Sequence, residues 1–247
     1  MAFICGFCNR SDVKPSREHV LPEWLSKVGS TISGGGMFSR EVDGKTISTP
    51  LIEVVTKRVC EPCNTLWLRR IEDSARPILT GLIDGSTSRI TESEQWLIAR
   101  WFYKTILTLH LAKTGRVDDP GIFGHDGFTN FYESAQLPAN LLVALCGYQG
   151  RLPMVRFAIA AHDSTAVTIF FHYYRVVLLV AVISQRTDLH VPKGFHEFRH
   201  VLWPRRRRDD WGVPDPTAPV SWPPKGILDE RSVDDLRHRW LRLDLDI

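Results

Sequence analysis

Long apolar runs are missing from this sequence. Their absence argues against a secretory signal peptide and against a membrane-spanning helix. The first ten residues, MAFICGFCNR, contain no apolar stretch of signal-peptide length. The longest apolar run, VVLLVAVIS from Val176, is too short to cross a bilayer and is typical of a buried strand. Internal repeats and low-complexity tracts are also missing. We therefore expect a soluble, cytoplasmic protein without a membrane partner.

A strong charge of one sign is missing as well. The 31 lysines and arginines nearly balance the 28 aspartates and glutamates, which leaves a net charge of +3. That value is too small to identify a nucleic-acid partner by itself. The remaining composition, with 43% hydrophobic and 24% charged residues, is that of an ordinary globular protein. A chain of 247 residues is long enough for one large domain or two small ones with a real core.

Cysteine is scarce, but four of the five cysteines fall into two C-x2-C pairs. The pairs are CGFC, with Cys5 and Cys8, and CEPC, with Cys60 and Cys63. In a reducing compartment this pattern favours a metal over disulfides. Four thiolates satisfy a tetrahedral zinc ion, and such a closed site leaves no position for chemistry. We predict one structural Zn²⁺ held by both pairs; the alternative is two unrelated pairs of buried cysteines.

Local patterns predict a hairpin and two helices in the first half of the chain. Polar and apolar residues alternate around Asp43-Gly44 in FSREVDGKTIS, which predicts a β-hairpin. Helical spacing follows the second cysteine pair over residues 64–79, so Cys60 and Cys63 are expected to open that helix. A long, largely buried helix is expected to begin at Thr91 and Glu94, which have capping-box spacing.

The second half contains a series of strand candidates with short connections rich in Gly, Pro, Asp or Ser, which predicts an antiparallel sheet. The candidates are NLLVALCGY, MVRFAIAA, AVTIFFHYY, RVVLLVAVIS and FRHVLWP. A proline-rich loop with four arginines at 205–208 and a short helix, SVDDLRHRWLRL, are expected to close the chain. The turn-rich segment 81–89 is the expected boundary. The fold class is therefore α+β, with one module at residues 1–81 and a second domain, of unassigned role, at residues 90–247.

Between the cysteine pairs, the stretch SREHVLPEWL places an acid and a histidine side by side, Glu18 and His19. A single histidine is most often a surface residue or a satisfied core residue. Here the pair falls inside the segment that zinc would close, and Leu21-Pro22 follows it. Asn64 comes directly after the second cysteine pair, at the start of an expected helix.

This order of features resembles the HNH endonucleases, also called ββα-metal or His-Me-finger nucleases, in their four-cysteine form. The resemblance covers roughly residues 1–80. It implies a zinc-stabilised, treble-clef-like ββα-metal module that hydrolyses nucleic-acid phosphodiester bonds, with DNA as the expected partner. It implies that His19 is the general base and that Glu18 and Asn64 bind a catalytic Mg²⁺ or Mn²⁺. By analogy with where such modules occur, it suggests bacterial antiviral defence or a mobile element.

The chemistry explains why these residue types belong together. Phosphodiester hydrolysis needs an activated water and a cation that stabilises charge on the phosphate and the leaving oxygen. A neutral imidazole can accept the proton of the water. Carboxylate and amide oxygens suit a hard divalent cation. Because adjacent strand residues point to opposite sides, Glu18 and His19 can serve one centre only from a bent or turn segment.

The sequence departs from the family pattern at two places. Leu68, which cannot bind a metal, stands where many of these enzymes have a further ligand. Glu72 lies one turn later and can supply the missing carboxylate, or it can form an ion pair with Arg69 or Arg76. The second departure is the middle asparagine, which often orients the base histidine. No asparagine occurs between Arg10 and Cys63.

Two other functions fit the same residues. One is a non-enzymatic zinc module that binds nucleic acid through its basic helix, which Leu68 and the absent middle asparagine favour. The other is a sensor or interaction protein whose second domain binds a regulatory ligand or a partner protein, with the zinc unit as a structural cap. A His19 side chain turned away from Glu18 and Asn64 would favour the first alternative. A deep apolar pocket in the sheet domain would favour the second.

Overall fold

The part of the chain that the computed structural model describes consists mainly of helices and antiparallel strands. The described residues are 3–28, 37–42, 45–50, 53–114, 123, 126–138, 141–147, 155–161, 166–173, 176–184, 200–203 and 219–222. The expected closing helix, the arginines 205–208 and the turn at Asp43-Gly44 lie outside these ranges. Within these ranges, no helix combines the length and the apolar character that a membrane span requires.

The first part of the chain is built from short strands and one short helix. In chain order it contains β1 (Glu18–His19), α1 (Glu23–Val28), β2 (Met37–Val42), β3 (Lys45–Pro50) and β4 (Val55–Thr56). Strands β2 and β3 form the predicted antiparallel hairpin. Strand β1 pairs with β4, and both strands are only two residues long. This short ladder fixes the segment that carries the acid-histidine pair.

The helix after the second cysteine pair begins as predicted but ends later. It opens with a π-helical segment, Cys63–Leu68, and continues as α2, Arg69–Asp84. Its apolar residues Leu79, Leu82 and Ile83 are buried, which holds the helix beyond the expected end at residue 79. Gly85, with φ of 79°, closes it in the left-handed conformation that glycine adopts without steric cost.

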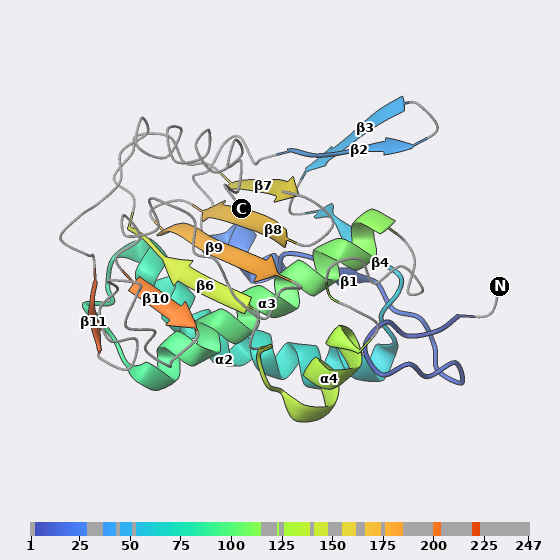
Figure 1. The fold of residues 1–247 in the computed structure, drawn as a ribbon, viewed down its shortest axis with the longest axis horizontal. Coiled ribbons are helices and arrows are strands. Elements are labelled where there is room, and N and C mark those ends of the chain that lie inside the picture. The colour runs from blue at the N-terminus through green and yellow to red at the C-terminus, as the bar shows by residue number, and fades with distance from the viewer. Residues whose placement is uncertain are drawn as a thin grey trace.

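Helix α3, Glu92–Thr114, confirms the prediction of one long buried helix. Its capping box is formed: the Glu94 amide donates to Thr91 Oγ1 at 3.4 Å, and the Thr91 amide donates to Glu94 Oε2 at 2.7 Å. Residues 101–109 are all buried, so this helix is covered on every side. It packs against α2 and against strand β10 (Figure 1).

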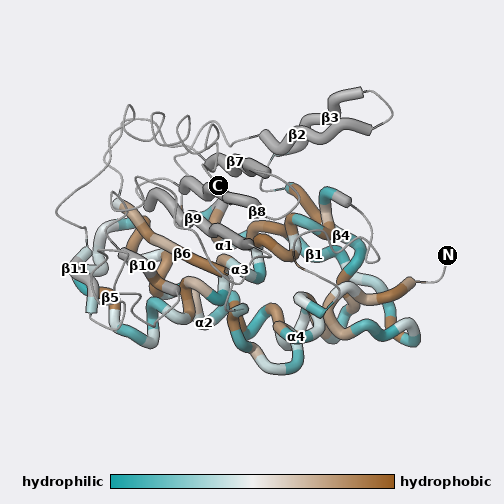
Figure 2. The backbone as a smooth tube through the Cα atoms, in the orientation of Figure 1, coloured by the Kyte–Doolittle hydropathy of each residue, from teal (hydrophilic) through white to brown (hydrophobic). Residues whose placement is uncertain are grey.

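The second half forms the predicted antiparallel sheet, with five strands in the order β10-β6-β9-β8-β7. The strands are β6 (Leu141–Leu145), β7 (Val155–Ala161), β8 (Ala166–Tyr173), β9 (Val176–Ser184) and β10 (His200–Trp203). All five residues of β6 are buried, as expected of a strand covered on both faces, and Figure 2 shows its hydrophobic character. The remaining elements are α4 (Gly127–Ser134) and the paired strands β5 (Arg89–Ile90) and β11 (Val220–Ser221).

One hydrophobic core runs through both parts of the chain. It includes Phe7 and Leu21 from the cysteine-containing part, helices α2 and α3, and strand β6. Aromatic contacts continue it: the Trp67 ring lies 5.4 Å from Phe7 and 5.2 Å from Phe131 of α4, between ring centroids. The division into units 1–81 and 90–247 stays a prediction about folding, but the described parts of both are packed together.

Candidate metal centre and polar cavity

The four paired cysteines come together at one point. Their sulfur atoms all lie within 4.8 Å of one another, so the cluster could bind a structural zinc ion. The first pair sits on a tight turn, closed by a hydrogen bond from the Asn9 amide to the Cys5 carbonyl at 3.0 Å. A backbone bond from Gly6 to Arg58, at 2.8 Å, ties this turn to the segment that leads into the second pair.

The sulfur spacing agrees with a tetrahedral metal site. Zinc–sulfur bonds of about 2.3 Å place tetrahedral sulfurs about 3.8 Å apart. The sulfurs of Cys8 and Cys60 are 3.7 Å apart, far beyond the roughly 2.05 Å of a disulfide, and the four paired cysteines form no disulfide. The Cys60 amide also donates to the sulfur of Cys5 at 3.4 Å, which favours a thiolate there.

The cysteines of this cluster differ in pKa because they are close together and partly buried. The hydrogen bond from Cys63 lowers the pKa of Cys5 to about 4. Burial raises the pKa of Cys60 to about 11, and the bond to Cys5 raises the pKa of Cys63 well above its ordinary value. Four neighbouring thiols therefore cannot all ionise together without a cation. A bound divalent cation would take the place of the shared protons.

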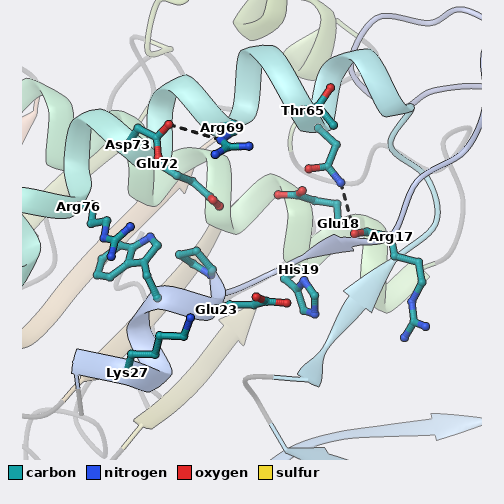
Figure 3. Close-up of a pocket in the computed structure, with 13 residues that line it drawn as sticks. Arg17, Glu18, His19, Glu23, Lys27, Thr65, Arg69, Glu72, Asp73 and Arg76 are labelled. Carbon is teal, nitrogen blue, oxygen red and sulfur yellow. Dashed lines mark hydrogen bonds and ion pairs between the residues drawn. The ribbon is translucent and has the colours of Figure 1, made fainter. Parts of the chain in front are cut away.

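Glu18 and His19 lie outside the cysteine cluster, on strand β1. The strand is extended, so the two side chains leave it in different directions, as Figure 3 shows. Glu18 is buried, with 5% of its surface exposed, and points toward helix α2. His19 is half-buried and lies beside Glu23. Strand β1 has no bend that would direct both side chains toward one catalytic centre. Both residues nevertheless line the same cavity.

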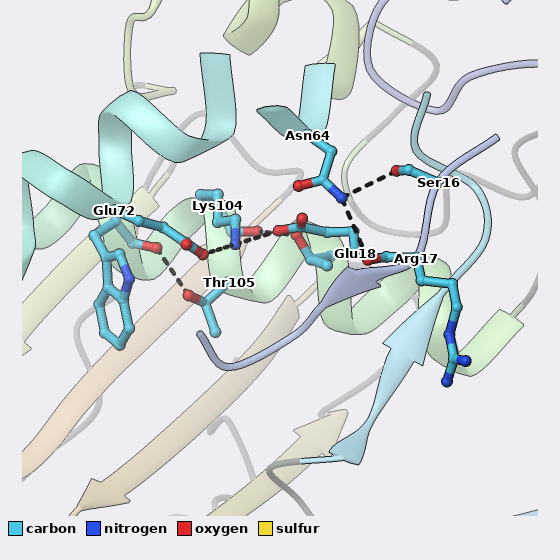
Figure 4. Close-up of polar contacts among 9 residues, drawn as sticks. Ser16, Arg17, Glu18, Asn64, Glu72, Lys104 and Thr105 are labelled. Atoms are coloured by element: carbon cyan, nitrogen blue, oxygen red, sulfur yellow. Dashed lines mark hydrogen bonds and ion pairs between the residues drawn. The ribbon is translucent and has the colours of Figure 1, made fainter. Parts of the chain in front are cut away.

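Asn64 is held in a fixed orientation at the start of its helix. Its Nδ2 donates to Ser16 Oγ at 3.1 Å and to the Arg17 carbonyl at 3.3 Å. With the nitrogen bound there, the amide oxygen lies on the side of Glu18, as Figure 4 shows. Asn64 thus shares the cavity wall with the acid-histidine pair.

A lysine from the second half of the chain reaches into this group. Lys104, on α3, is fully buried, and its Nζ lies 2.6 Å from Glu18 Oε1 and 2.5 Å from Glu72 Oε1. Figure 4 shows the ammonium between the two carboxylates. Glu72 had been expected to bind a metal or to pair with Arg69 or Arg76. Among the described residues, Lys104 is its ion-pair partner, and Arg69 pairs with Asp73 instead.

The charges of this triad depend on burial and on each other. Burial lowers the pKa of Lys104, but Glu18 and Glu72 more than compensate, so its pKa is raised and the ammonium stays charged at neutral pH. Burial raises the pKa of Glu18, and Lys104 opposes this shift. With both carboxylates ionised, two negative charges face one positive charge.

The cavity beside this triad has a volume of about 340 Å³ and is lined mainly by polar side chains. Its lining includes Glu18, His19, Asn64 and Glu72, together with Thr65. The four residues singled out from the sequence outside the cysteine pairs therefore share one opening. Cysteine side chains do not line it, so the cavity is separate from the cysteine cluster.

Cationic side chains surround the same opening. Arg17, Lys27, Arg69 and Arg76 line it and are exposed. The Arg76 guanidinium lies 6.0 Å from the Trp24 ring centroid, at the outer limit of a cation–π contact. Exposed Glu23 and Asp73 line it as well, and Asp73 pairs with Arg69 at 3.6 Å, so charges of both signs lie at the rim.

Lys104 was not among the residues expected at the site, although the sequence carries a signal for it. It stands alone among apolar residues in WFYKTILTL, inside a helix that is buried all round. A lysine at such a position must be paired with acids, since an unpaired buried charge is very costly. The sequence does not say which acids those are.

Comparison of the chain with family models, with curated proteins and with solved structures gave no match.

Proposed function

We propose that this protein is a metal-dependent endonuclease of the HNH type, which hydrolyses phosphodiester bonds in nucleic acid, with DNA as its substrate. One observation carries the proposal. Glu18, His19, Asn64 and Glu72 line one polar cavity, and exposed cationic and acidic side chains lie at its rim. This cavity lies next to a four-cysteine cluster suited to zinc. The zinc would stabilise a treble-clef-like module, and phosphodiester hydrolysis would take place in the cavity.

The oxygen donors fit a hard divalent cation. Carboxylate and amide oxygens are what Mg²⁺ or Mn²⁺ prefers, and Glu18, Glu72 and the anchored Asn64 offer them. The ion pairs of Lys104 are with the Oε1 atom of each carboxylate, and each carboxylate has a second oxygen. A bound cation would stabilise negative charge on the phosphate and on the leaving oxygen.

The protein side chains would do the remaining work. His19 would accept the proton of the attacking water at an imidazole nitrogen. Its position on the more open side of β1 is compatible with contact to water in the cavity. Arg17, Lys27 and Arg76 would hold the phosphates of the strand on either side of the bond that breaks.

Two observations favour a second candidate, a nucleic-acid-binding module without catalysis. The Lys104 ammonium lies between the two carboxylates, and His19 points away from Glu18. In that case the cationic rim would bind phosphates and the acidic floor would be structural. This candidate requires affinity for nucleic acid without cleavage.

Cleavage and binding assays with different nucleic acids and metal ions distinguish the two candidates. Purified zinc-loaded protein is incubated with supercoiled plasmid, single-stranded DNA and RNA, in Mg²⁺, Mn²⁺ or EDTA. The proposal expects DNA cleavage with either cation and none in EDTA. Binding of all three nucleic acids with no cleavage under any condition would support the second candidate. Cleavage that persists in EDTA would contradict a metal-dependent reaction.

A further inference from the structure

We propose that Lys104 is a positioning residue of the acidic centre, which sets both the separation of Glu18 and Glu72 and the charge that a divalent cation meets. This inference rests on the proposed function, because it assumes that the cation binds beside these two carboxylates. It assigns a role to helix α3, which lies outside the part of the chain that resembles HNH nucleases.

The contacts place Lys104 at the junction of three elements. Glu18 comes from β1, Glu72 from α2 and Lys104 from α3, and the Nζ lies 2.6 and 2.5 Å from the two carboxylates. The lysine side chain has no exposed surface, and the carboxylates are 6% and 19% exposed. An ammonium so enclosed cannot turn away to solvent. It therefore fixes where both carboxylates stand.

The positive charge of Lys104 also affects how strongly a cation binds beside the two carboxylates. With both carboxylates ionised, the triad carries a net charge of −1, whereas two carboxylates alone would carry −2. A buried pair without the ammonium would attract a divalent cation more strongly, since electrostatic interactions are less screened there than in water. Lys104 would therefore keep cation binding weaker and readily exchangeable. It would also keep the carboxylates apart without a metal.

A purely structural ion triad is the competing explanation. In that case the lysine would only satisfy two buried acids, and its loss would loosen the site. A looser site binds a cation more weakly or not at all. The two explanations thus differ in the sign of the change in cation affinity, and not merely in its size.

The test measures Mn²⁺ binding by the full-length, zinc-loaded protein, followed as the loss of the free-ion signal in electron paramagnetic resonance. Two variants change the charge of the triad, Lys104→Met to −2 and Glu72→Gln to 0, and the double variant restores −1. Lys113→Met, at an exposed lysine in the last turn of the same helix, is the matched control. Zinc content and near-ultraviolet circular dichroism verify that each protein is folded.

Lys104→Met is expected to bind Mn²⁺ at least about tenfold more tightly than the wild type, and Glu72→Gln at least about tenfold more weakly. The double variant should return to within about threefold of the wild type, because its net charge is restored. Lys113→Met should leave the affinity unchanged. If Lys104→Met alone does not fold, the double variant is compared with Glu72→Gln and should bind more tightly.

The outcomes separate this inference from the proposed function. Equal or weaker Mn²⁺ binding by folded Lys104→Met, with metal-dependent cleavage intact in the wild type, would overturn the role of Lys104 alone. Binding by Lys104→Met but none by the wild type would support the role of Lys104 and overturn the metal-dependent reaction. No Mn²⁺ binding by any of the proteins would overturn both.

Discussion

Replacing Cys60 by serine tests whether a zinc ion holds the first part of the chain together. Cys60 is buried, its sulfur lies 3.7 Å from that of Cys8, and its amide donates to Cys5. The hydroxyl of serine is a poor substitute for a thiolate toward zinc. The substitution removes one of four ligands at the point where the first turn meets the start of the helix.

The expected loss is large compared with the stability of a domain. Structural zinc contributes about 10–16 kcal/mol of apparent binding free energy in small zinc-dependent units, and that energy is coupled to folding. Whole domains are stable by only about 5–15 kcal/mol. Since Phe7 contacts Trp67 and Trp67 contacts Phe131, loss of the cluster would also loosen the packing of α4. We expect Cys60→Ser to unfold the first part of the chain and to lower the thermal midpoint of the rest.

Zinc content by mass spectrometry and thermal unfolding by circular dichroism measure this effect. The wild type should carry one zinc per chain. Cys146→Ser is the matched control, since Cys146 is buried but lies outside the cluster. It should keep its zinc and lose only about 1–3 kcal/mol, the cost of burying a hydroxyl. Wild-type protein that is folded without zinc, or a Cys60→Ser protein as stable as Cys146→Ser, would refute the reasoning.

Three further predictions follow from the contacts around the cavity. Lys104→Met should destabilise the protein by about 3–5 kcal/mol at neutral pH, because it leaves two buried carboxylates facing each other. Burial raises the pKa of Glu18, and the variant loses the ammonium that opposes this shift, so the deficit should shrink as the pH falls through that raised pKa in urea titrations; a deficit that grows on acidification would contradict this. Asn64→Leu should cost about 1–3 kcal/mol in the same titrations, through its lost bonds to Ser16 and Arg17, whereas an unchanged midpoint would show those bonds to be unimportant. Arg17→Ala should weaken DNA binding and reduce the slope of log affinity against log salt by about one in fluorescence anisotropy, and an unaltered slope would remove it from the phosphate contacts.

Features specified by neighbouring residues could be predicted from the sequence. The capping box at Thr91 and Glu94 formed as its spacing predicted, because both partners lie within one turn. The hairpin β2–β3 and the five-stranded antiparallel sheet also formed, since alternation and turn residues are local signals. The paired cysteines could be assigned to one cluster because C-x2-C spacing carries the chemistry in itself.

Features that depend on packing between distant segments could not be predicted. Lys104 meets Glu18 and Glu72 only because α3 lies against α2, and a local pattern does not encode that contact. Helix α2 continued past Gly81 because Leu82 and Ile83 are buried, which outweighs the low helix propensity of glycine.

The most direct measurement of the central claim compares plasmid cleavage in Mg²⁺ by the wild type and His19→Ala, purified identically and matched in zinc content and thermal midpoint. If His19 is the general base, single-turnover cleavage should fall by about 10²–10⁴-fold while DNA affinity stays nearly the same. The His19 side chain on β1 is only half-buried, so its replacement by alanine should leave the fold intact. Equal Mg²⁺-dependent cleavage by both proteins would contradict the assignment of His19, and no cleavage by the wild type in Mg²⁺ or Mn²⁺ would contradict the proposed activity itself.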